Sequence, residues 1–302
     1  MFQRILVPLD GSEYAEAALP MAAHIAQAAN GTVVLLHVLS GVREFLPYIL
    51  PMMEPSTLAA DVDAAAAYLE AVAAQPELAR VTTVTEIRSG QAGTTILDVA
   101  EEHHADLVVL AARGHTGLAR WAPGNVVEHV EHHGKMPVLS LSNTNALPPT
   151  DRPAYGLVLL DGTSEAEAAI APAKELLAAL SNAERERATL HLAWTGTFEP
   201  EGATLHNGRE DVKEYLHAVE EQLHADSQSD WPLTVTAEVI AEENLHQAVA
   251  DLAQQQQATF IALAPHGQRG FPLYTSADFD EHLRGATDLP LLLVPHHAMA
   301  RT

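Results

Sequence analysis

The chain repeats itself, and this internal repeat restricts its possible folds more than any other feature of the sequence. Four landmarks occur twice, in the same order and 151 to 154 residues apart. A repeat of this length in a chain of 302 residues predicts two copies of one domain. The landmarks are ILVPLDGS at residues 5–12 with LVLLDGT at 157–163, LHV at 36–38 with LHL at 190–192, ADLVVLA at 105–111 with ATFIALA at 258–264, and MPVL at 136–139 with LPLL at 289–292.

The segment between the copies has the composition of a linker. Residues 142–150 (SNTNALPPT) are polar and contain two adjacent prolines. We therefore expect a first domain at residues 1–142, a linker at 143–153 and a second domain at 154–302.

Each copy alternates short apolar runs, typical of buried strands, with longer alanine-rich stretches, typical of helices. This alternation predicts an α/β fold class, with two tandem doubly wound domains that each hold five parallel strands covered on both faces. A ligand of such a sheet binds outside the carboxyl ends of the strands. Strands are expected near residues 4–9, 33–39, 81–87, 107–111 and 138–141, and again near 156–160, 188–194, 233–239, 259–263 and 291–294; helices of the first copy are expected near 13–29, 57–74, 94–104 and 124–133.

The charge balance excludes several classes of partner. There are 16 Lys and Arg against 40 Asp and Glu, a formal net charge of −24. This balance disfavours nucleic-acid backbones and anionic membrane surfaces, which both require cationic patches. The chain has no cysteine, which excludes disulfides and thiol chemistry. Neither a secretory leader nor an apolar stretch of membrane-spanning length is visible, so we expect a cytoplasmic protein with no nucleic-acid and no membrane partner.

The first strand is expected to end at Asp10, which Gly11 and Ser12 follow. A turn glycine and a helix-capping serine account for Gly11 and Ser12 without any ligand. They account less well for Asp10, because a carboxylate at the carboxyl end of a strand stands where ligands bind. Asp10 is therefore a candidate acceptor for a ribose hydroxyl or a base amine.

The fourth strand is followed by a spaced glycine motif. Ala111 is followed after two residues by Gly114, and Gly114 after nine residues by Gly124 and Asn125. With the opening ILVPLDGS and the closing MPVL, this motif resembles the universal stress protein family in its tandem two-domain form, over nearly the whole chain. The family's nucleotide-binding members carry glycine, two residues, glycine, nine residues, then glycine followed by serine or threonine.

The resemblance implies a Rossmann-like fold of the adenine nucleotide alpha hydrolase-like class and an ATP site, with or without Mg²⁺, in the first domain. Backbone amides at a helix N-terminus bind phosphates without needing Lys or Arg. The resemblance also implies dimers, through edge strands or through pairing of the two domains within the chain, at residues 137–141 and 290–294. It places Pro8, Leu9, Asp10 and Val38 near adenine and ribose; Leu110, Ala111 and Gly114 beneath ribose and phosphates; Gly124, Asn125 and Val126 around the phosphates; and Arg113 as a nearby cation, together with His115.

Departures from the family motif are unequal between the copies. In the first copy, alanine stands at 111 and asparagine at 125, where Asn125 also fits a helix cap. In the second copy, Ala277 replaces the last glycine and Asp278 follows it, which puts a carboxylate beside the expected phosphates. Asp278, with Glu281 three residues on, is typical of an acidic helix cap. Because the second half carries 24 acidic residues against 16 in the first 150, we expect ATP mainly in the first domain.

The histidines are expected to be structural or solvated, and no metal site is predicted. His129 and His133 lie four residues apart on a predicted helix and share one face, but no third ligand of fixed geometry accompanies them. His37 and His191 recur within matching landmarks, where partly buried and hydrogen-bonded imidazoles are the usual outcome.

The resemblance to the universal stress protein family implies a stress-response regulatory protein that binds ATP and acts through conformation, dimerisation or partner choice, and that is not an enzyme. A slow ATP-hydrolysing enzyme is one alternative, although the chain lacks the Gly-x-x-x-x-Gly-Lys-Ser/Thr motif and no general base stands out. An interaction scaffold that binds no nucleotide is another.

Overall fold

The computed structural model describes residues 2–39, 55–112, 126–142, 153–181, 188–195, 208–226, 233–240, 244–264 and 276–295. The chain divides into two compact units, Met1–Leu147 and Pro148–Thr302. This division falls inside the segment predicted as a linker.

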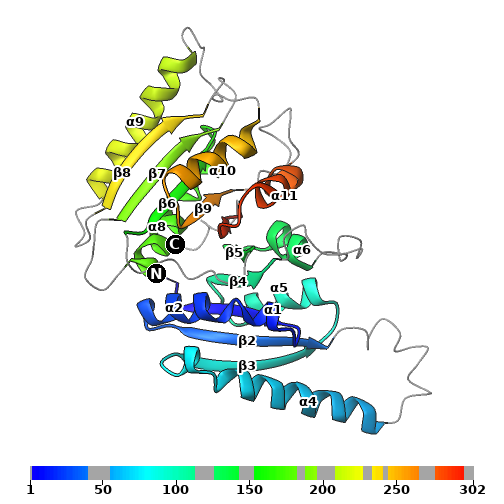
Figure 1. The fold of residues 1–302 in the computed structure, drawn as a ribbon. Coiled ribbons are helices and arrows are strands. Elements are labelled where there is room, and N and C mark those ends of the chain that lie inside the picture. Colours follow the sequence, from blue (N-terminus) through cyan, green and yellow to red (C-terminus); the bar gives the residue numbers. More distant parts are fainter. Residues whose placement is uncertain are drawn as a thin grey trace. The chain divides into compact units, whose positions relative to one another are not determined.

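The first unit is a parallel sheet in the strand order β3-β2-β1-β4-β5 (Figure 1). Because β1 lies in the middle and the chain proceeds outward from it in both directions, the sheet is doubly wound, which confirms the predicted fold class. Its strands are β1 (Arg4–Leu9), β2 (Thr32–Leu39), β3 (Thr82–Ser89), β4 (Leu107–Ala111) and β5 (Val138–Leu141); its helices are α1 (Glu13–Glu16), α2 (Leu19–Ala29), α4 (Pro55–Ala73), the 3-10 turn η1 (Pro76–Leu78), α5 (Ala92–Glu102) and α6 (Val126–His133).

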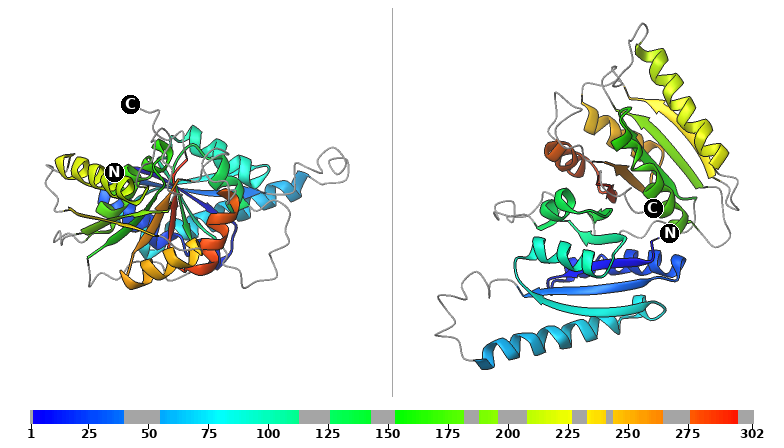
Figure 2. Two further views of the ribbon diagram at one scale, coloured as in Figure 1. Left: turned by 90° about the horizontal axis from the view of Figure 1, so that it is seen from above. Right: turned by 180° about the vertical axis from the view of Figure 1, so that it is seen from behind.

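Apolar side chains cover both faces of this sheet. On one face, Leu6 and Leu36 pack with Ile96 of α5 and Val130 of α6 in one buried cluster. The residues that alternate with them, such as Ile5, are equally buried, and α2 and α4 contact the strands β1, β2 and β3. Figure 2 shows these helices on the two sides of the sheet, with α4 running along β3. Burial on both faces explains why β1, β2 and β4 are near-continuous apolar runs, whereas the end strand β3 is mixed in composition and partly exposed.

The second unit repeats this order as β8-β7-β6-β9-β10. Leu157 and Leu159 pack with Val249 of α10 and Leu283 of α11 on one face, while α8 and α9 contact β6, β7 and β8. The strands are β6 (Tyr155–Leu160), β7 (Ala188–Trp194), β8 (Leu233–Val239), β9 (Phe260–Leu263) and β10 (Leu291–Leu293); the helices are α7 (Ser164–Glu167), α8 (Ile170–Leu180), α9 (Gly208–Asp226), α10 (Leu245–Gln255) and α11 (Ser276–Ala286).

The helix expected near residues 13–29 is two helices, α1 and α2. Pro20 lies in the first turn of α2, where its missing N–H removes a bond that a continuous helix would need. The second unit is interrupted in the same way between α7 and α8.

The predicted match of His37 with His191 is wrong. Strand pairing places His37 opposite Leu9 in the first unit and Trp194 opposite Leu160 in the second. Because Leu9 and Leu160 each precede the strand-end aspartate, the residue equivalent to His37 is Trp194. The landmark LHL therefore matches LHV in letters but lies three residues earlier in the register.

Candidate functional site

The candidate site begins where β1 ends. Leu9 is the last residue of the strand, and Gly11 has φ +83°, a conformation that glycine adopts without steric cost. The Ser12 side chain then accepts a hydrogen bond from the Ala15 amide at 3.1 Å and caps α1, as predicted. The chain thus turns sharply at the carboxyl edge of the sheet and presents Asp10 there.

Asp10 is exposed and only partly used by the turn. Its Oδ1 accepts hydrogen bonds from the Ser12 amide at 3.0 Å and from the Ser12 hydroxyl at 2.5 Å. Within the described residues, its Oδ2 accepts none. The carboxylate is therefore held in a fixed orientation by one oxygen and offers the other to a donor.

The structure places seven of the eleven predicted binding residues. Pro8 and Leu9 lie at the end of β1, Val38 near the end of β2, Leu110 and Ala111 at the end of β4, and Val126 begins α6. Since β1, β2 and β4 are adjacent and parallel, their carboxyl ends share one edge of the sheet with Asp10. Leu110 is buried and Val38 packs against the same core cluster. The remaining four, Arg113, Gly114, Gly124 and Asn125, lie outside the described residues.

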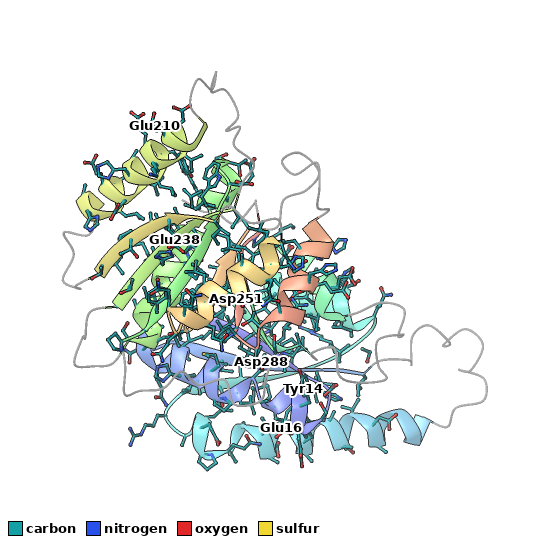
Figure 3. The ribbon with its side chains drawn as sticks, turned by 45° about the horizontal axis from the view of Figure 1, so that its top comes forward. Tyr14, Glu16, Glu210, Glu238, Asp251 and Asp288 are labelled. Carbon is teal, nitrogen blue, oxygen red and sulfur yellow. The ribbon has the colours of Figure 1, made fainter. Side chains whose placement is uncertain are left out.

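The sequence reading missed Tyr68, Glu16 and Tyr14, which surround the turn. The Tyr68 hydroxyl of α4 donates to Glu16 Oε1 at 3.1 Å, and Gln75 Nε2 donates to Glu16 Oε2 at 2.9 Å. The Tyr14 hydroxyl donates to the Ala112 carbonyl just beyond β4. Figure 3 shows Tyr14 and Glu16 on the same short helix, α1.

Tyr68 has a strongly perturbed phenol. Burial raises its pKa, and the hydrogen bond and the negative charge of Glu16, with a contribution from Asp10, raise it further, while the Gly11 amide acts in the opposite direction. The ring of His37 lies edge-to-face with Tyr68, with 5.7 Å between the ring centroids and 67° between the ring planes. Its Nδ1 donates to the Leu9 carbonyl at 2.9 Å. A clue was present in the sequence, because Glu16 recurs as Glu167 after the same 151 residues that separate the two aspartates.

The second unit repeats the turn with a covered carboxylate. Gly162 has φ +86°, and Asp161 Oδ1 accepts from the Thr163 amide and hydroxyl at 3.0 and 2.6 Å. Asp161, however, is only 9% exposed. The expectation that Asp278 caps a helix is wrong in position, because α11 begins at Ser276 and Asp278 is its third residue.

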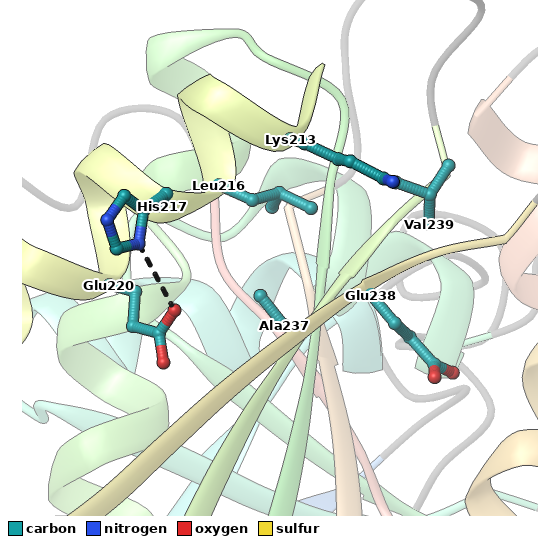
Figure 4. A pocket seen from close by; sticks show the side chains of 7 residues that line it. All are labelled: Lys213, Leu216, His217, Glu220, Ala237, Glu238 and Val239. Atoms are coloured by element: carbon teal, nitrogen blue, oxygen red, sulfur yellow. Dashed lines mark ion pairs between the residues drawn. The ribbon is translucent and has the colours of Figure 1, made fainter. Parts of the chain in front are cut away.

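A cavity of about 360 Å³ lies between α9 and β8 of the second unit (Figure 4). Its charged groups of both signs include Lys213 and Glu238, and His217 forms an ion-pair contact with Glu220 at 3.8 Å when protonated. Although Glu238 and Val239 lie at the carboxyl end of β8, that strand is two places from β6 and its Asp161. This cavity is therefore separate from the strand-end turn.

Two of the three histidines of α6 form a stacked pair. The rings of His129 and His133 are 4.4 Å apart and nearly parallel, and His133 Nδ1 donates to the His129 carbonyl at 3.0 Å. Among the residues that the structure describes, no group of three or more His, Cys, Asp or Glu side chains is placed to hold a metal ion. None of the described helices is both long and apolar enough to cross a membrane.

Comparison with known proteins gives one consistent result. The sequence model of the Universal stress protein family matches residues 1–141. A universal stress protein of a Synechocystis species is 34% identical over 114 residues, which are 38% of this chain and 69% of that protein. One from Methanocaldococcus jannaschii is 29% identical over 142 residues, 46% of this chain and 81% of that protein. A solved universal stress protein from Archaeoglobus fulgidus shares the fold across both units, with TM-score 0.69, 18% identity, and coverage of 97% of this chain and 96% of that one.

Proposed function

The chain belongs to the universal stress protein family, and from this premise we propose that its first unit binds an adenine nucleotide, ATP, at the carboxyl ends of β1, β2 and β4. The protein would act as a stress-response regulator through the conformation that the bound nucleotide stabilises.

The exposed carboxylate of Asp10 is the observation that carries this proposal. Its Oδ1 is engaged by Ser12, so its Oδ2 has a defined direction and lacks a donor among the described residues. A ribose has two neighbouring hydroxyl donors that match such an acceptor. A hydrogen bond to a charged group contributes about 1.5–3 kcal/mol, enough to orient a small ligand.

The phosphates would lie at the start of α6. This helix begins at Val126, directly after the glycine motif, and the backbone amides of a first helical turn attract anions. The motif spacing and this helix start together support a phosphate site at Gly124, Asn125 and Val126. Mg²⁺, where it takes part, would enter as the ion that accompanies the nucleotide phosphates.

The second unit would bind ATP poorly or not at all. Its strand-end Asp161 is covered, whereas Asp10 is exposed. Its motif has Ala277 and Asp278 in place of glycine and a polar residue, and a carboxylate there repels phosphate. These two differences are independent of each other and favour the same asymmetry.

Calorimetric titration of the full chain with ATP tests the proposal. We expect binding by the unsubstituted chain, its loss in Gly124→Glu, and its retention in the matched variant Ala277→Glu. Absence of heat at millimolar ATP would contradict nucleotide binding and favour a scaffold. Equal loss in both variants would contradict the asymmetry.

We also propose that the role is regulatory rather than enzymatic. Phosphoryl transfer requires cationic stabilisation of the developing charge, and the chain lacks the lysine-containing phosphate loop that commonly supplies it. Phosphate release from ATP that is abolished by Asp10→Ala, but not by Asp161→Ala, would favour the slow-hydrolysis alternative.

Dimerisation through sheet edges remains part of the proposal. Within their own units, β5 pairs with β4 and β10 pairs with β9, and each stands last in its strand order. The outer backbone groups of the last strand in a unit can pair with a further strand. Light scattering of the full chain in the presence and absence of ATP measures the oligomeric state directly.

A further inference from the structure

Tyr68 connects three parts of the strand-end site that come from distant regions of the sequence. Its hydroxyl donates to Glu16 on α1, its ring meets the edge of His37 on β2, and the Gly11 amide and Asp10 carboxylate act on its phenol. Tyr68 itself belongs to α4, a 19-residue helix. A single side chain therefore ties this long helix to the turn that presents Asp10.

The contact between Tyr68 and Glu16 of α1, called the tie below, is strong for a side-chain contact. Both oxygens of Glu16 are occupied, one by Tyr68 at 3.1 Å and the other by Gln75 at 2.9 Å. Hydrogen bonds to a charged acceptor are about twice as strong as neutral ones. Since α1 has only four residues and follows the Asp10 turn directly, moving Glu16 also moves the turn.

The second unit contains the same tie without the exposed carboxylate. Tyr215 of α9 donates to Glu167 of α7 at 2.8 Å, and its ring meets Trp194 edge-on at 5.5 Å. A contact present in both units contributes to the fold of each. Only in the first unit does it lead to an aspartate that is exposed to a ligand.

We propose that Tyr68 is a positioning residue that couples the nucleotide site to α4, an inference that rests on the proposed function. Tyr68 and Glu16 hold the Asp10 turn in the orientation that accepts the ribose, so nucleotide binding strengthens the tie in return. By thermodynamic linkage, the stabilisation that α4 gains when the nucleotide binds equals, in free energy, the nucleotide affinity that the contact between Tyr68 and Glu16 adds. Nucleotide binding at this site therefore stabilises α4 in the first unit, whereas it leaves the stability of α9 in the second unit unchanged.

The test compares Tyr68→Phe with its matched control Tyr215→Phe in the full chain. Each variant keeps its ring and loses one hydroxyl, so both are expected to lower the denaturation midpoint to a similar degree. Tyr68→Phe alone should weaken ATP binding, by about three- to ten-fold, the factor that corresponds to one net hydrogen bond. Hydrogen exchange supplies a second readout: ATP should slow exchange in α4 of the unsubstituted chain, and this protection should disappear in Tyr68→Phe.

Glu16 provides a check that is independent of Tyr68. Glu16→Gln keeps one acceptor for the tyrosine hydroxyl but loses the charge, so it should weaken binding less than Glu16→Ala. Glu16→Ala should weaken binding at least as much as Tyr68→Phe, because it also loses the bond from Gln75. The double variant Tyr68→Phe, Glu16→Ala should bind no more weakly than Glu16→Ala alone, because the contact between Tyr68 and Glu16 is already lost in that single variant.

Three results would overturn the inference. If the unsubstituted chain binds ATP and Tyr68→Phe binds it equally well, nucleotide binding stands and the coupling is refuted. If the unsubstituted chain shows no binding, both the proposed function and the coupling fail. Equal weakening by Tyr215→Phe would also contradict the coupling, because it would assign the effect to general stability.

Discussion

His37 and Trp194 occupy the same register position in the two units, each opposite the leucine that precedes the strand-end aspartate. Each also meets, edge-on, the tyrosine that is bound to the first short helix of its unit. Their environments nevertheless differ. His37 is partly exposed and bonded to a backbone carbonyl, while Trp194 is fully buried. The equivalent position is thus part of a partly exposed, polar strand end in the first unit and part of the apolar core in the second.

Replacing these two residues should have unequal effects on stability. Trp194→Ala is expected to lower the free energy of unfolding by about 3–5 kcal/mol, because it removes a large, fully buried side chain. His37→Ala should lower it by about 1 kcal/mol, through loss of its bond to the Leu9 carbonyl. Chemical denaturation followed by circular dichroism measures both. Equal losses would contradict the difference in packing.

Asp10→Ala should weaken ATP binding by about ten-fold or more, because it removes a charged acceptor from the strand end. The matched variant Asp161→Ala should leave ATP affinity unchanged, although it also loses the two hydrogen bonds to Thr163. Calorimetric titration of both variants, with melting curves to confirm folding, measures the contrast. If Asp161→Ala weakened ATP binding more than Asp10→Ala, the nucleotide would bind in the second unit, which contradicts the proposal.

Gly93→Ala should destabilise the first unit by about 1–3 kcal/mol, the range found for overpacked cores. A Cβ at position 93 on α5 would lie 2.7 Å from the ring of His129 on α6, and 3.1 Å from its Cβ, so the whole side chain is in the way. The double variant Gly93→Ala, His129→Ala should regain part of the loss. Thermal melting detects this, and a double variant less stable than Gly93→Ala would contradict the steric explanation.

The second unit has different side chains at the equivalent contact between its helices. The residues 153 positions later are His246 and His282, whose rings stack 5.2 Å apart between α10 and α11. A glycine–histidine contact in one copy is therefore a histidine–histidine contact in the other.

Stability should decrease as the pH falls below about 6.5, in part because of His191. Burial lowers the pKa of this imidazole below its ordinary 6.5, although Glu238 acts in the opposite direction. Between the two pKa values the unfolded chain binds a proton that the folded chain does not, so acid favours unfolding. The slope can reach about 1.4 kcal/mol per pH unit.

Denaturation midpoints measured from about pH 8 to about pH 5 test this, with His191→Gln as the comparison. The variant should be less stable at the upper end, since it loses packing against Tyr155, yet less sensitive to acid. An unchanged slope would show that other groups account for the acid sensitivity.

Much of the fold was predictable because its signals are local. Short apolar or β-branched runs between alanine-rich stretches placed the strands within a residue or two of β1 to β10, since the central strands, which are buried on both faces, are largely apolar. The turn at Asp10 and the cap at Ser12 followed from residue type alone, and the structure shows the same arrangement at Asp161 and Thr163. The split between α1 and α2 was missed although Pro20 marks it.

The wrong or missing predictions concern which residues lie next to each other when they come from different segments of the chain. His191 was matched to His37 because three letters agree, but strand register is set by which side chains pack against the neighbouring strand, and a slip changes the face that each residue occupies. Tyr68 and Glu16 are 52 residues apart, and nothing local links them.

Sequence by itself determined that this chain holds two α/β units and that each brings an aspartate to the carboxyl end of its first strand, because periodicity and turn chemistry are properties of short segments. Only the tertiary structure decided that Asp10 is exposed while Asp161 is covered, and that a tyrosine from a distant helix holds each short helix in place. Exposure and long-range contacts depend on how whole elements pack together, and the same local motif can therefore end in an open site in one copy and a closed one in the other.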